Sequence, residues 1–112
     1  MEQNVGMLSD WLNAHVNQTL VIEKYELSDR DIVHFNLEGV EFRSGEDTID
    51  DYLENALVLR GTGNTLNADG EQVPLPQHSY EIVVTQLQMG PSDEKKLEVN
   101  TERAKYILSI EE

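Results

Sequence analysis

Three things are scarce in this sequence of 112 residues: cysteine, basic side chains and long apolar stretches. Because the chain has no cysteine, disulfides, cysteine-ligated zinc sites and cysteine nucleophiles are excluded together. No apolar stretch approaches the roughly 18 residues that a membrane-spanning helix needs. The first residues lack the positively charged region and the apolar core of a secretory signal. We therefore expect a cytoplasmic protein that has no membrane partner.

The shortage of basic residues is large, with eight Lys and Arg against 22 Asp and Glu and a net charge of −14. Nucleic-acid affinity depends mainly on Lys and Arg side chains that neutralise phosphates, so we expect no direct binding of nucleic acid. Apolar residues make up 38% of the chain and charged residues 27%, which is ordinary for a folded protein. The length fits one domain over residues 1–112.

Apolar residues recur at helical spacing from Val5 to Val16, which predicts one amphipathic helix over residues 5–16. Asn4 and Asn17 are suitable residues to begin and end it. The rest of the chain carries short runs of alternating apolar and polar residues, which is typical of strands with one buried face. These runs predict strands at 19–27, 32–42, 56–60, 79–89, 97–99 and 104–110.

Glycine and proline indicate where these strands bend or end. The alternation that begins at Val33 changes parity after Leu37, which predicts a β-bulge near Gly39 because one extra residue restores the apolar set to the core side. The glycine-containing run 61–64 is expected to end the strand before it. The prolines of 73–76 restrict that segment to an edge strand or an extended connector.

This order of elements predicts an α+β fold. The N-terminal helix packs on an antiparallel sheet, or on a small, partly open barrel, of five to seven short strands. The connections between strands are too short for the crossover helices that parallel pairing demands. An edge strand near Pro74 or at the C-terminal end also allows the chain to form a homodimer.

An acidic run is the strongest local anomaly, with five carboxylates in nine residues: Glu46, Asp47, Asp50, Asp51 and Glu54. Carboxylate oxygens are ligands for Ca²⁺ and Mg²⁺, so these residues are candidate metal ligands. Their spacing does not follow the calcium-loop pattern, and runs of like charge are usually solvated. We therefore favour a solvated loop over a metal site and expect no cofactor.

No catalytic constellation is visible in the sequence. His15, His34 and His78 fall on the predicted helix, a predicted strand and a loop, and no two of them have the spacing of paired metal ligands. The run 61–64 lacks the lysine and the following helix of a phosphate-binding loop. Ser79 and His78 are neighbours in the sequence, which does not make them a catalytic arrangement. We therefore predict no catalytic and no cofactor-binding residue.

Three functions remain open at this point. The first is a non-enzymatic protein-interaction or regulatory module with a protein partner. The second is a mimic of nucleic acid that inhibits a DNA-handling protein, because a row of carboxylates imitates phosphates. The third is a small-ligand binder or enzyme whose site lies in the mouth of a barrel, lined by Trp11 and by tyrosines that otherwise belong to the core.

A local resemblance bears on the second function. Leu8-Ser9-Asp10 followed by Leu20-Val21-Ile22 resembles the opening helix and first strand of the phage inhibitors of uracil-DNA glycosylase. These are small acidic helix-and-sheet proteins that occupy the DNA cleft of their target, so the resemblance implies a similar fold and a basic cleft as partner. It covers about twenty residues. The strand continues Glu23-Lys24-Tyr25-Glu26, in place of the Gln-Glu-Ser-Ile that engages the enzyme in that family.

Overall fold

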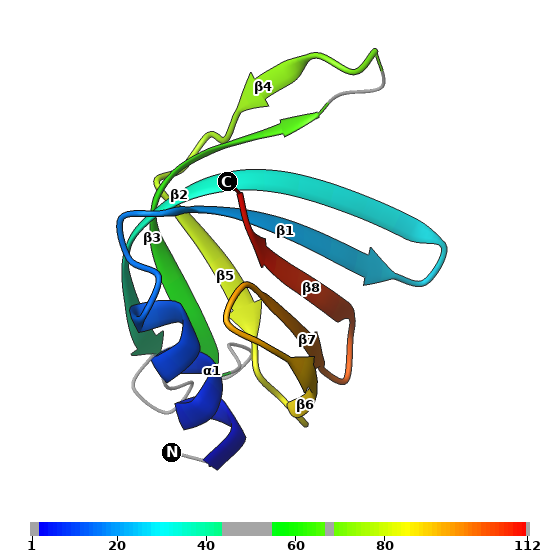
Figure 1. The fold of residues 1–112 in the computed structure, drawn as a ribbon. Coiled ribbons are helices and arrows are strands. Elements are labelled where there is room, and N and C mark those ends of the chain that lie inside the picture. Colours follow the sequence, from blue (N-terminus) through cyan, green and yellow to red (C-terminus); the bar gives the residue numbers. More distant parts are fainter. Residues whose placement is uncertain (1–2, 44–54, 67–68, 112) are drawn as a thin grey trace.

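A computed structural model describes residues 3–43, 55–66 and 69–111 of the chain. These residues form one N-terminal helix followed by eight strands (Figure 1). The elements are α1 (Gln3–Asn13), β1 (Thr19–Glu26), β2 (Asp29–Arg43), β3 (Ala56–Leu66), β4 (Gln72–Pro74), β5 (Ser79–Val83), β6 (Gln88–Ser92), β7 (Lys96–Asn100) and β8 (Lys105–Ile110).

The strands form one sheet in the order β4-β3-β2-β1-β8-β7-β6, and β5 pairs with the first half of β3. Each of these pairings is antiparallel. The sheet curves around α1 without closing into a barrel, because β5 and β6 do not pair with each other within the described residues (Figure 1). The predicted α+β fold with a helix packed on an antiparallel sheet is therefore confirmed, in its open-sheet form.

The helix turns one apolar face toward the sheet. Val5, Leu8 and Leu12 are buried, which matches the spacing that predicted the helix. The helix ends at Asn13, three residues earlier than predicted, and Asn17 adopts a positive φ of 74° beyond it. The backbone amide of Asn17 donates to the carbonyl of Leu37 at 2.7 Å, so this asparagine ties the end of the helix segment to β2.

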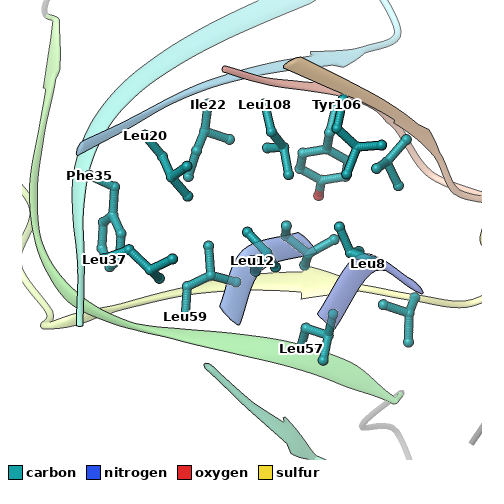
Figure 2. Close-up of a cluster of buried hydrophobic side chains, with 14 of the residues drawn as sticks. Leu8, Leu12, Leu20, Ile22, Phe35, Leu37, Leu57, Leu59, Tyr106 and Leu108 are labelled. Carbon is teal, nitrogen blue, oxygen red and sulfur yellow. The ribbon is translucent and has the colours of Figure 1, made fainter. Parts of the chain in front are cut away.

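The core consists of the buried face of α1 and of inward-facing side chains from the sheet, several of which are shown in Figure 2. In β1, β2 and β8 the buried residues alternate with less buried ones, as a sheet with one covered face requires. Among the described residues, each buried side chain is hydrophobic. Each fully buried Leu, Ile or Phe contributes roughly 1.5–3 kcal/mol. The largest fully buried members are Leu8, Leu12, Leu20, Ile22, Phe35, Leu37, Leu57, Leu59, Ile82, Leu97 and Leu108.

The predicted bulge is present, because the register between β2 and β3 shifts between Leu37 and Gly39. Strand β3 does not end at Gly61, however, and continues to Leu66. A Cβ atom on Gly61 would lie 1.9 Å from the backbone oxygen of Asn36, and the φ of Gly61 is +154°. The glycine therefore allows two central strands to approach beside the bulge, in place of the turn that the sequence predicts.

The predicted strand over residues 79–89 is two strands, β5 and β6, separated by a turn. Gln86 adopts a positive φ of 55° in this turn, while Val84 and Leu87 on either side are buried. The apolar pattern continues through the turn, so alternation alone indicates one strand. This division gives eight strands in place of the predicted five to seven. Strand β4 contains Pro74 and lies at an edge of the sheet, as its proline requires.

Two glycine-to-alanine substitutions test the close approach at the bulge. Gly61→Ala is expected to lower the free energy of unfolding by at least about 2 kcal/mol, because β2 and β3 would have to move apart. Gly6→Ala is the matched control, since a Cβ atom on Gly6 of α1 would meet nothing within 4 Å, and it is expected to raise stability by about 0.5–1 kcal/mol. Chemical denaturation measures both, and equal effects would contradict the close approach.

Candidate functional site

A groove of about 710 Å³ lies where the end of α1 meets the sheet. The helix contributes Trp11, strand β1 its first residue, Thr19, and the end of β8 contributes Ile110. The turn between β6 and β7 closes the groove with Glu94 and Lys95. These segments lie far apart in the sequence, and the open sheet brings them together. The other lining residues are Ala14, His15, Gln18 and Glu111.

Trp11 and His15 form the organised part of the groove. Their ring centroids are 4.3 Å apart with an interplanar angle of 44°, as expected for residues four apart near a helix end. The indole Nε1–H of Trp11 donates to the carbonyl of Asp93 at 3.0 Å. This hydrogen bond to the β6–β7 turn fixes the orientation of the indole. Trp11 is the only tryptophan in the chain.

Both ring nitrogens of His15 are occupied. Nδ1 lies 2.7 Å from the carbonyl oxygen of Trp11, and Nε2 lies 2.7 Å from that of Glu94. With a carbonyl at each nitrogen, His15 acts as a connection between α1 and the β6–β7 turn, and it offers no free nitrogen to a metal or a substrate.

The other two histidines do not line this groove, although His34 contacts Glu111, which does. Nδ1 of His34 lies 3.0 Å from a carboxylate oxygen of Glu111, and His78 is exposed between β4 and β5. Within residues 3–43, 55–66 and 69–111, no three His, Cys, Asp or Glu side chains are grouped so that they could hold a metal ion. The proposed acidic metal ligands lie outside the described residues: Glu46, Asp47, Asp50, Asp51 and Glu54.

The tyrosines divide between core and surface. Tyr106 is buried and Tyr80 packs against the core, with its ring centroid 6.4 Å from that of Phe35. Burial raises the pKa of both phenols. These two tyrosines therefore belong to the core, and neither is in the lining of the groove beside Trp11. Tyr52 lies outside the described residues.

The second surface feature is the tip of the β1–β2 hairpin, which extends beyond the other central strands (Figure 1). Glu26 pairs with Asp29, so Leu27 and Ser28 form a two-residue turn. Leu27 adopts a positive φ of 55°, and 99% of its surface is exposed. Glycine and asparagine favour such backbone positions, and a left-handed conformation costs other residues about 1–2 kcal/mol. No sequence pattern singles out Leu27.

A polar cluster on the outer face supports this hairpin. The hydroxyl of Tyr25 donates to Oε2 of Glu23 at 2.8 Å, and Nη2 of Arg30 lies 3.0 Å from the same oxygen. The guanidinium of Arg30 also lies 5.8 Å from the centre of the Tyr25 ring. The hydrogen bond from Tyr25, followed by the one from Arg30, holds the pKa of Glu23 below its ordinary value.

Substitution of Glu23 tests this cluster through the pH dependence of stability. A lowered pKa in the folded state means that the ionised carboxylate stabilises the fold above pH 4.5, and that this contribution is lost as the pH falls through the folded value. Glu23→Gln is expected to lower the free energy of unfolding by about 0.5–1 kcal/mol at pH 7, and the difference should disappear under acid conditions. The exposed Glu38 provides the matched control as Glu38→Gln, which should show no such pH dependence in thermal unfolding.

The described part of the chain includes no helix with the length and apolar character needed to cross a membrane. The whole chain, residues 1–112, matches the model of a family described as YmzB-like protein. It is also similar to the uncharacterized protein YmzB of Bacillus subtilis (strain 168), with 40% identity over 111 residues that cover 93% of this chain and 92% of that protein. No solved structure matches the chain. On these two matches, the chain belongs to the YmzB-like protein family.

Proposed function

We propose that this chain is a non-enzymatic protein-interaction module of the cytoplasm that binds a basic partner protein through the tip of its β1–β2 hairpin. The observation that carries the proposal is Leu27, an exposed leucine in a backbone conformation that leucine disfavours. Strained residues of this kind gather where proteins bind ligands and partners.

The side chain of Leu27 does not stabilise the isolated fold. Its side chain is 99% exposed and buries no apolar surface, and glycine would form the same turn without the backbone strain. In a complex, burial of a leucine side chain in a partner pocket contributes roughly 1.5–3 kcal/mol. Such a contribution is enough to make a residue an anchor of an interface.

The charge around Leu27 indicates the character of the partner. Glu26 and Asp29 pair next to the turn, and Asp31 lies opposite Lys24. The nearby Arg30 is bound to Glu23. The chain as a whole carries −14, so its field attracts basic surfaces and accelerates their encounter with the hairpin. The complementary partner surface is an apolar pocket with a rim of Lys and Arg side chains. A DNA-handling protein with a basic cleft is one partner of this description.

Substitution of Leu27 separates binding from stability. Leu27→Gly is expected to raise the free energy of unfolding by about 1 kcal/mol because it relieves the positive φ, and to abolish partner binding at the same time. A variant that only damaged the fold would lose both. The measurement is affinity capture from the native cell at low salt, with the captured protein identified by mass spectrometry and thermal unfolding recorded in parallel.

Val73→Thr on β4 is the matched control, because Val73 is a 40% exposed apolar residue away from the hairpin and threonine has a similar shape. It should retain the partner in full. Binding should weaken as ionic strength rises, and competition by duplex DNA would identify the partner surface as a nucleic-acid site. Capture of the same protein in equal amount by Leu27→Gly would contradict the proposed function.

A further inference from the structure

We propose that the groove beside Trp11 is a binding site for an arginine side chain of the partner protein. The site lies at the opposite end of β1 from Leu27, since Thr19 begins the strand at the groove and the hairpin turn follows Glu26. At about 3.3 Å per residue, the strand separates the two sites by roughly 25 Å. The proposal rests on the proposed function and adds the chemistry of a second contact.

The charges that line the groove favour a cation. Glu94 from the β6–β7 turn and Glu111 after β8 contribute two carboxylates, against the positive charge of Lys95, and the carboxylate of Glu111 is also bonded to His34. The helix also ends here, and its last turn contains no basic residue. The C-terminal end of a helix carries a partial negative charge. The helix end therefore adds to the net negative charge of the groove.

Trp11 gives the groove a surface suited to guanidinium. A planar guanidinium stacks on an indole face, and such contacts are worth about 0.5–2 kcal/mol. His15 packs against Trp11, and the Nε1–H bond to Asp93 holds the ring in place. Because the ring is already ordered, little conformational entropy is lost on binding. Ile110 and Ala14 in the same lining provide apolar contact for the methylene stem of arginine.

Other occupants fit these observations less well. Within the described residues no three metal-ligating side chains are grouped to hold an ion, and an uncharged ligand would make no use of the charge on the two carboxylates. A second copy of the chain would bring a further net charge of −14 and would be repelled. The volume of about 710 Å³ is within the usual range for ligand sites, with room for one side chain and adjoining backbone.

The single tryptophan makes the site directly measurable, because any change in tryptophan fluorescence reports on Trp11. The probes are two capped tripeptides at low salt, Gly-Arg-Gly and Gly-citrulline-Gly, which differ in charge but have nearly the same shape. The arginine peptide should produce a saturable change in fluorescence. The citrulline peptide should bind at least about tenfold more weakly, which corresponds to about 1.4 kcal/mol.

Paired substitutions distinguish the groove from general attraction to an acidic protein. The double variant Glu94→Gln/Glu111→Gln should weaken binding of the arginine peptide at least about fivefold. The control Glu38→Gln/Glu102→Gln removes the same charge from exposed positions outside the groove lining and should change it less than about twofold. Lys95→Gln should tighten binding, because it removes a like charge from the groove.

Equal binding of the two peptides, or equal weakening by the two double variants, would overturn the groove proposal. Partner capture that depends on Leu27 but survives Glu94→Gln/Glu111→Gln would also overturn it, while the proposed function would stand. The reverse outcome can also be distinguished. If the groove binds the arginine peptide selectively and Leu27→Gly still captures the partner in full, the arginine site stands and the proposed function fails.

Discussion

The helix α1 buries Leu8 and Leu12 against the inner face of the sheet, and the positions of the surface features follow from that contact. The sheet curves around the helix, and inward-facing aliphatic residues of β1, β2, β3 and β8 surround it (Figure 2). Because the end of the helix is held against this curved sheet, Trp11 and His15 reach the β6–β7 turn. The groove therefore forms because one short helix packs against an open, curved sheet.

Charged and apolar side chains are separated in this structure. The core needs no charge, and each of its buried side chains in the described residues is hydrophobic. The net charge of −14 lies outside it and opposes compactness through self-repulsion. Local pairs on the outer face reduce that repulsion where strands meet, as between Lys105 and Glu98 at 2.6 Å and between Arg30 and Glu23. The remaining carboxylates leave the surface with a negative field.

Features that depend on the local pattern could be predicted from the sequence, and features that depend on distant contacts could not. The helix and the bulge near Gly39 follow from the spacing of apolar residues, and both are present. The continuation of β3 through Gly61 depends on the approach of Asn36 in another strand, so the glycine alone suggested a turn. No sequence pattern indicates the positive φ of Gln86, because the alternation of apolar residues continues across this position.

The same distinction applies to the surface sites. Hydrogen bonds at the groove join Trp11 to Asp93 and His15 to Glu94. These pairs are 82 and 79 residues apart in the sequence. No motif links such positions in a single chain. Leu27 is an ordinary residue in the sequence, and what distinguishes it is its backbone conformation and its exposure in the structure.

The place of β1 in the sheet has a consequence for biosynthesis. This strand lies between β2, its neighbour in the chain, and β8, which follows it at a great distance along the chain. The first pairing closes a short loop, but the second closes a long one at a greater entropic cost, and pairings between distant segments form slowly. While the chain is being translated, one edge of β1 stays unpaired until β8 has emerged from the ribosome. Nascent molecules therefore pass through a stage at which this edge is open to intermolecular strand pairing.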